Sequence, residues 1–174
     1  MRWIALALLV AACGSAGPRE ESDWERQNFP RQQASDDSAP PPAYPAPAHL
    51  LEFPVIGANG FRFFIDGSTL APDKDGVVRY VLVARSPDGV DNVTYEGLRC
   101  RSAEQRIFAL GRDGSWTTAR GAWRPISAPR HRVLYDEYFC PQSVAIRTAY
   151  EGVLALQQGG HPFSQGFAGE GKAR

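Results

Sequence analysis

Residues 77–101, VVRYVLVARSPDGVDNVTYEGLRCR, contain the strongest strand and turn signals of the chain. The two halves of this stretch, 77–85 and 92–101, are rich in Val, Tyr and Leu, and Val and Tyr in particular favour an extended backbone. Between them, Ser86-Pro87-Asp88-Gly89 contains the proline and the Asp-Gly pair that are typical of a tight turn. The stretch therefore predicts two antiparallel strands joined as a β-hairpin.

The turn also sets an expected register for the two strands. If Arg85 pairs with Val90, Arg79 faces Glu96 across the hairpin. One face then carries apolar side chains: Val78, Tyr80, Leu82, Ala84, Val93 and Tyr95. The pair Arg79 and Glu96 has two interpretations. It is either a half-exposed ion pair worth less than about 1 kcal/mol, or a ligand-binding patch in which the arginine binds an anion.

Further Asp-Gly pairs divide the neighbouring sequence into segments of strand length; they are Asp66-Gly67, Asp75-Gly76 and Asp113-Gly114. With the hairpin, about five strands are predicted, at 61–65, 77–85, 92–101, 105–110 and 115–118. Consecutive strands joined by such short turns form an antiparallel meander.

The C-terminal part changes to a helical period. Apolar residues recur at helical spacing between Ser143, which can serve as N-cap, and Gly159-Gly160, which would end the helix: Ile146, Tyr150, Val153 and Leu154. Residues 133–139 are a second candidate helix. We therefore expect a single α+β domain, an antiparallel meander with one or two C-terminal helices packed on it.

The N-terminus indicates export. Arg2 precedes an apolar run at 3–12, which is too short to span a bilayer that needs about 20 residues. Val10-Ala11-Ala12-Cys13 looks like the lipobox of bacterial lipoproteins, in which the signal is cut before a lipidated cysteine. Gly14 after the cysteine, rather than Asp, implies in that class sorting to the outer membrane. The alternative is a plain secretory signal in which Cys13 is incidental.

The cysteine count agrees with an exported protein. If Cys13 carries lipid, Cys100 and Cys140 remain, in a compartment that oxidises thiols. A disulfide between them would close a loop that the chain-entropy relation values at about 4 kcal/mol. A redox-active pair or a metal site is the alternative, but redox pairs are usually closer in sequence and zinc needs further ligands.

Composition divides the chain into four parts. Residues 1–12 are the predicted signal peptide, and 13–49 are the lipidated N-terminus with a proline-rich tether that holds seven of the 14 prolines. Residues 50–158 are the predicted domain. The glycine-rich tail at 159–174 is expected to be disordered.

Several motifs of the predicted domain occur together: DGVVRY at 75–80, NVTYEGLRC at 92–100, GSW at 114–116, Trp123, and YFCP at 138–141. They resemble the CNP-one-like (CNP1-like) family of small proteobacterial envelope proteins. The stretch NVTYEG is the most specific part, and the resemblance covers about residues 50–156. It implies an envelope domain with no established biochemical activity.

No catalytic motif is found in the sequence. His49, His131 and His161 match no metal-ligand spacing, and neither a nucleophile elbow nor a phosphate-binding glycine loop occurs. His131, between two arginines, is interpreted as a solvated loop residue. We expect no catalytic residue, no metal and no cofactor. The balance of 19 basic against 19 acidic residues argues against nucleic acid as a partner.

The sequence thus favours a lipid-anchored protein on the periplasmic face of the outer membrane, held there through Cys13. The expected role is a non-enzymatic interaction or assembly factor with an envelope protein as partner. The alternative is an envelope-acting hydrolase or a small-ligand-binding module that uses the Arg79 and Glu96 face. In that alternative Glu96 is the acid or base, and Arg79 or Arg99 steers the substrate.

Overall fold

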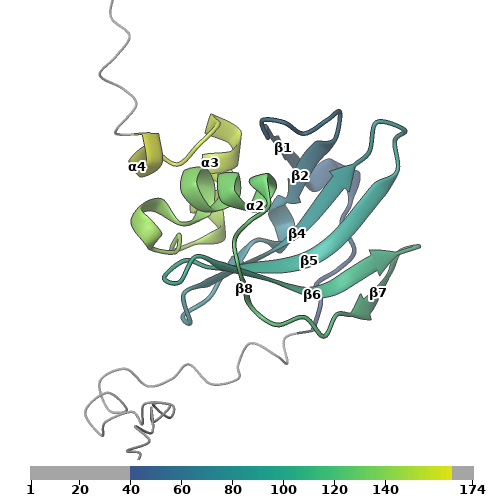
Figure 1. Ribbon diagram of the computed structural model, residues 1–174, viewed down its shortest axis with the longest axis horizontal. Helices are drawn as coiled ribbons and strands as arrows, with labels where there is room; N and C mark the ends of the chain where they lie inside the picture. The colour runs from purple at the N-terminus through teal and green to yellow at the C-terminus, as the bar shows by residue number, and fades with distance from the viewer. Residues whose placement is uncertain (1–39, 166–174) are drawn as a thin grey trace, which may run out of the picture. The chain divides into compact units, whose positions relative to one another are not determined.

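The central hairpin of the fold is formed by β4 (Val77–Arg85) and β5 (Asp91–Arg99). The computed structural model describes residues 40–165 of the chain. In it, six strands follow one another in the order β1-β2-β4-β5-β6-β7, and every neighbouring pair is antiparallel (Figure 1). The remaining strands are β1 (Leu50–Phe53), β2 (Arg62–Asp66), β6 (Glu104–Arg112) and β7 (Ser115–Thr118), with the short β3 (Ala71–Pro72) beside β4 and β8 (Arg124–Pro125) beside β6. The predicted meander is confirmed and extended.

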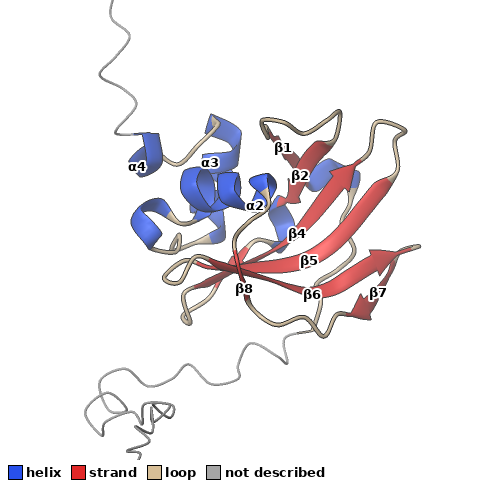
Figure 2. Cartoon of the chain, viewed as in Figure 1, coloured by secondary structure: helices blue, strands red, loops and turns tan. Residues whose placement is uncertain are grey.

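Helices cover one part of this sheet. The C-terminal half contains α2 (Pro129–Val133), the π-helical turn η3 (Leu134–Phe139), the 3-10 turn η4 (Pro141–Ser143), α3 (Ala149–Gln158) and α4 (Pro162–Gln165). Two further 3-10 turns, η1 (Pro47–His49) and η2 (Gly67–Thr69), flank the first strands. The helices gather over β1, β2 and β4, whereas β6 and β7 lie clear of them (Figure 2). The α+β class with helices near the C-terminus is confirmed.

Apolar side chains are buried on both faces of the sheet. The larger cluster lies on the side of the helices and includes Tyr80, Leu98 and Tyr138. The smaller cluster lies on the outer side and contains Phe64, Val81, Val83, Val93, Tyr95 and Ala109. Burial on both faces explains why β4 is apolar at nearly every position.

The hairpin register differs by one residue from the predicted one. Arg85 pairs with Asp91, because the Ser86 N–H donates to the carbonyl oxygen of Val90 at 2.9 Å and Gly89 takes a φ of 81°. The loop is thus a three-residue loop whose left-handed glycine produces a bulge. A shift of one residue turns every side chain of one strand to the other face.

This shift separates the two charged residues of the predicted pair. Arg79 lies opposite Gly97, and Glu96 lies opposite Tyr80. The predicted cross-strand pair of Arg79 and Glu96 is therefore wrong. The two side chains project from opposite faces of the sheet, and so the predicted face that they were to share does not exist.

The last long helix begins later than predicted. Thr148 is its N-cap, and the Thr148 Oγ1 accepts a hydrogen bond from the Glu151 N–H at 3.1 Å. Ser143 has a φ of 64°, which a residue starting a right-handed helix cannot adopt. The buried side of α3 carries Gly152, Ala155 and Leu156. Of the predicted apolar stripe, Ile146 and Val153 pack in or against the larger cluster, but Tyr150 is 74% exposed, so the prediction was partly wrong. The helix ends at left-handed Gly159, as predicted.

A disulfide joins Cys100, which follows β5, to Cys140, which follows η3, with their Cα atoms 5.2 Å apart. Both residues are buried in the larger cluster. The bridge ties the helical layer to the sheet, as the cysteine count predicts.

Both ends of the described region pack more closely than predicted. The Trp116 Nε1–H donates to the Pro42 carbonyl at 2.9 Å, and Tyr44 lies 5.3 Å from Trp116 between ring centroids. Residues 40–49 therefore belong to the domain and not to a tether. His161 is 3% exposed and precedes α4, so residues 159–165 are not the expected disordered tail. Half-buried ring contacts and hydrogen bonds hold both segments.

Some predictions lie outside the described residues. They concern the signal at 1–12, Cys13, the tether up to residue 39 and the tail from residue 166. Within residues 40–165, no helix has both the length and the apolar composition needed to cross a membrane.

Candidate functional site

Arg79 lies on the outer face of the sheet, where its side chain makes structural contacts. Its guanidinium pairs with Asp75 at 2.8 Å and Asp73 at 3.1 Å, and it lies 5.7 Å from the centroid of the Phe108 ring. The side chain is buried. Arg79 thus closes the turn that precedes β4, in which both aspartates lie, and its charge is already balanced.

Arg99, the third candidate binding residue, also lies at the outer face but away from Glu96. Its guanidinium stacks 4.0 Å from the centroid of the Trp123 ring and pairs with Glu104 at 3.1 Å. The structure therefore does not bring Arg79, Glu96 and Arg99 together into one site.

Glu96 lies in the interior, on the side of the helices, with only 1% of its surface exposed. Its carboxylate is 2.7 Å from Nε2 of His131 and accepts a hydrogen bond from Thr94 Oγ1 at 2.7 Å. The Tyr80 hydroxyl donates to it over 3.4 Å. Four side chains from β4, β5 and α2 thus form one buried polar cluster, which is called the Glu96 cluster below.

His131 is the member of this cluster that sequence reasoning missed. It is 2% exposed in α2 and is not the solvated loop residue that the flanking arginines indicate. Pro129 at the start of α2 marks a helix N-terminus in the sequence. No local signal, however, indicates which side of so short a helix faces the sheet.

Glu96 is a carboxylate at neutral pH. Burial acts to raise the pKa of its carboxyl group, but the hydrogen bond and attraction of His131 and the hydrogen bond of Thr94 hold that pKa below its ordinary value. Burial and the charge of Glu96 raise the pKa of Tyr80 well above the usual range, so Tyr80 stays neutral. A carboxylate and an imidazole in contact can move a proton, yet both are sealed from any substrate.

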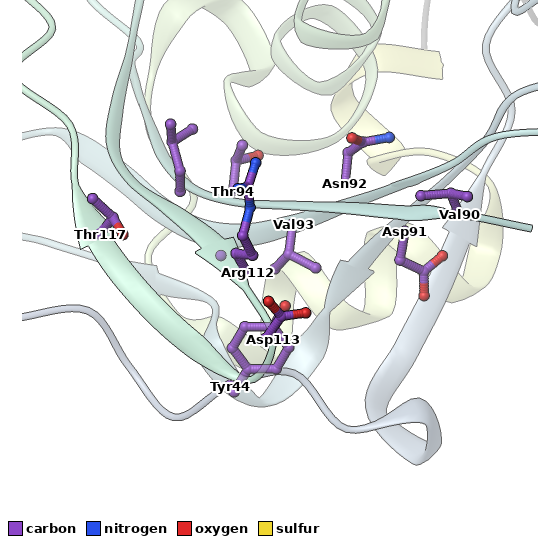
Figure 3. Close-up of a pocket in the computed structure, with 11 residues that line it drawn as sticks. Tyr44, Val90, Asp91, Asn92, Val93, Thr94, Arg112, Asp113 and Thr117 are labelled. Carbon is purple, nitrogen blue, oxygen red and sulfur yellow. The ribbon is translucent and has the colours of Figure 1, made fainter.

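Thr94 connects this buried cluster to a surface groove. The strands β5 and β6 part after the pair Val93 and Gly111, and a groove of about 710 Å³ lies at this fork. It is lined by residues 90–94, residues 110–113, Tyr44 and Thr117 (Figure 3). Its volume lies within the range of small-molecule sites.

The groove has two sides. Asn92, Thr94 and Arg112 project toward one side of the strands, and Asp91, Val93 and Asp113 project toward the other (Figure 3). The first side is the one that faces the helical layer, because Thr94 pairs with Leu82 of the larger cluster. Thr94, Leu110 and Thr117 form one row across β5, β6 and β7 on this side. Since the helices do not reach this row, Leu110 remains 49% exposed.

The charged side chains at the groove differ in whether they have a partner of opposite charge. Asp91 is held by Arg85 through contacts of 2.7 and 2.9 Å. Within residues 40–165, by contrast, no carboxylate pairs with the exposed guanidinium of Arg112. The groove thus offers the cation of Arg112 beside hydroxyl and amide groups on one side, and the carboxylate of Asp113 on the other side.

A smaller hollow of about 290 Å³ lies beside α3 and α4, where His161 Nε2 is 2.9 Å from Glu151. No group of three His, Cys, Asp or Glu side chains in the described part of the chain could hold a metal ion.

Comparison with known proteins gives a family match over most of the chain. A model of the CNP1-like family matches residues 30–157, which include both strands of the hairpin, both bridged cysteines and the whole Glu96 cluster. The chain is also similar to cryptic neisserial protein 1 of Neisseria gonorrhoeae, with 30% identity over 106 residues. That alignment covers 50% of this chain and 52% of the relative, so the chain spans about half the length of this relative. No solved structure matches the chain.

Proposed function

This chain belongs to the CNP1-like family, and we propose that it is a lipid-anchored cell-envelope protein whose folded domain holds a partner without catalysing a reaction. One observation supports the proposed binding of a partner without catalysis. The groove between β5 and β6 is open and has an available cation, whereas the carboxylate and imidazole that could perform chemistry are buried behind it.

The anchor is proposed from the sequence around Cys13. The disulfide between Cys100 and Cys140 supports an oxidising compartment and leaves Cys13 as the remaining cysteine. With two or more acyl chains, membrane attachment becomes stable. The proposed location is the periplasmic face of the outer membrane.

The interaction role is favoured over the hydrolase that the sequence raises as its alternative. That hydrolase needs Glu96 and Arg79 on one accessible face, but the register puts them on opposite faces and both are buried. A substrate could reach neither of them without opening the core. The groove can receive a partner without any such rearrangement.

Labelling tests the anchor. Cells that express the chain are grown with radiolabelled palmitate, and the protein is purified beside a Cys13→Ala variant. We expect label on the wild-type chain alone and release of the variant from the membrane fraction. A wild-type chain without label would overturn the anchor.

Site-specific crosslinking tests the groove. A photoreactive amino acid is placed at Thr117, and as a matched control at Tyr150, which is exposed on α3 away from the groove. After irradiation of intact cells, the adducts are identified by mass spectrometry. The proposal expects an adduct that forms from position 117 and not from position 150. Equal adducts from both positions, or adducts from position 150 alone, would contradict it.

A further inference from the structure

The row of Thr94, Leu110 and Thr117 in the groove offers side chains and not backbone to a ligand. Thr94 pairs with Leu110, and Leu110 pairs with Thr117, so the backbone of this row is engaged within the sheet. An extended peptide is usually recognised by adding a strand to a free sheet edge. The face of this row therefore favours a ligand that is recognised through hydroxyl and amide side chains.

The hydroxyl of Thr94 is oriented before any ligand arrives. Its proton is donated to the Glu96 carboxylate at 2.7 Å, and Glu96 is itself held by His131. The lone pairs of Thr94 Oγ1 are consequently left to accept a hydrogen bond. The Asn92 Nδ2 donates to the Ala84 carbonyl at 3.3 Å, which leaves the Asn92 carbonyl oxygen as an acceptor. The buried Glu96 cluster thus acts as a support for an acceptor in the groove.

Apolar and polar groups alternate across the row. Leu110 stands between the two threonines, on strands about 4.8 Å from its own. A sugar ring has the matching pattern, with C–H groups on its faces and hydroxyl groups at its rim. Tyr44 lines the groove from its other side, next to Val93, and is not part of this row.

The charged side chains of the groove restrict the chemical class of its ligand further. Arg112 lies on the same side as Thr94 and Asn92, while the Asp113 carboxylate projects to the other side (Figure 3). A guanidinium matches the planar geometry of a carboxylate with two parallel hydrogen bonds. One cation balances the single charge of a carboxylate better than the charge of about −1.5 to −2 on a phosphate monoester.

We infer that the groove between β5 and β6 binds a glycan that carries a carboxylate, with Arg112 on the carboxylate and Thr94, Asn92 and Thr117 on the hydroxyl and amide groups. This inference rests on the proposed binding role of the groove and specifies the chemistry of its partner.

Two sugars that differ in one group test the inference that the groove binds a carboxylate-bearing glycan. N-Acetylmuramic acid carries a lactyl carboxylate that N-acetylglucosamine lacks. Each is titrated into the purified full-length chain in detergent, and binding is followed by saturation-transfer NMR. We expect the acid to bind about tenfold more tightly, as one charge-assisted bidentate contact provides.

Variants assign the contacts. Arg112→Gln should lower the affinity for N-acetylmuramic acid to that for N-acetylglucosamine. The affinity for N-acetylglucosamine should not change. Arg124→Gln, an exposed arginine on β8 outside the groove, is the matched control and should change neither affinity. Thr117→Val should weaken the binding of both sugars by a similar factor. The Thr117 hydroxyl is exposed, so its removal does not disturb the core.

The outcomes separate this inference from the proposed function. Discrimination between the sugars that survives in Arg112→Gln overturns the role of Arg112. If neither sugar binds and a glutamate-rich peptide does, the inference that the ligand is a glycan is overturned. In the second case a crosslinked protein at position 117 would leave the proposed interaction role standing.

Discussion

The Glu96 carboxylate lies 2.7 Å from Nε2 of His131, a residue 35 positions further along the chain, and both side chains are almost completely buried. This contact joins β5 to α2 across the interface between the sheet and the helical layer. Because Thr94 in the groove bonds to the same carboxylate, the stability of the core and the shape of the groove depend on one polar contact.

The first prediction concerns the energy of this pair. Removing one partner leaves a buried polar group unpaired, so Glu96→Leu and His131→Leu should each lower the free energy of unfolding by about 3–5 kcal/mol. The double variant should cost less than the sum, with a coupling of about 1–3 kcal/mol. Urea unfolding measures all four proteins. The exposed pair of Glu52 and Arg62 serves as the control and should show a smaller coupling. Additive losses at Glu96 and His131 would exclude the coupling.

The second prediction is a pH dependence of stability. The folded-state pKa of Glu96 lies below its ordinary value of 4.5, so the carboxylate stabilises the fold above that pH. This contribution is lost as the pH falls below 4.5 and passes the folded pKa. In Glu96→Gln the group no longer titrates, and the loss of stability below pH 4.5 should be shallower than in the wild type. Urea unfolding at a series of pH values compares the slopes, and identical slopes would refute the assignment.

The third prediction concerns Gly152 in α3. A Cβ at this position would lie 2.6 Å from Ile146 Cδ1 and closer still to Leu70 Cδ2, and both of these side chains are buried. Gly152→Ala should therefore cost about 1–3 kcal/mol through overpacking, despite the better helix propensity of alanine. Gly121→Ala is the control, since its Cβ would meet only a carbonyl oxygen at 3.6 Å. A stable Gly152→Ala protein would show that α3 can shift on the sheet.

The fourth prediction concerns the disulfide. The Cys100→Ala, Cys140→Ala double variant should lose about 4 kcal/mol, because the bridge constrains the unfolded chain. Alkylation of the unfolded wild-type protein without reductant should modify neither cysteine. Two alkylated cysteines at these positions would show that the bridge does not form.

The fifth prediction concerns the segment that precedes β1. Trp116→Phe removes the hydrogen bond to the Pro42 carbonyl and keeps an aromatic ring near Tyr44. We expect a loss of about 1 kcal/mol and faster hydrogen exchange at the His49 amide, which donates to the Ala46 carbonyl at 3.0 Å, with β4 unchanged. Exchange measured by mass spectrometry checks this. Unchanged exchange at His49 would mean that the hydrogen bond of Trp116 does not hold the segment.

Local features of the sequence were sufficient to predict most elements of the fold. The strand at 77–85 has the predicted bounds because its Val-rich run and the following Pro-Asp-Gly turn act on neighbouring residues. The helix end at Gly159 follows for the same reason, since only the left-handed conformation of that residue is needed. The strand β1 was missed because four residues after a short 3-10 turn leave too little alternation to recognise.

The register of the hairpin could not be decided in this way. A loop of four residues and a three-residue loop with a glycine bulge have the same Ser-Pro-Asp-Gly sequence, and they differ by one position in every pair that follows. That single position decides whether Glu96 faces Arg79 or the helical layer. All candidate sites on the hairpin depended on it.

The antiparallel α+β architecture, the pairing of the two domain cysteines and the family could be predicted from residue patterns alone, because backbone preferences, a cysteine count and short motifs act locally or by elimination. The contact of Glu96 with His131 and the open row of Thr94, Leu110 and Thr117 emerge only from the packing of the folded chain. Such contacts join residues far apart in the chain, and their formation depends on how the helical layer packs over one half of the sheet and leaves the other half uncovered.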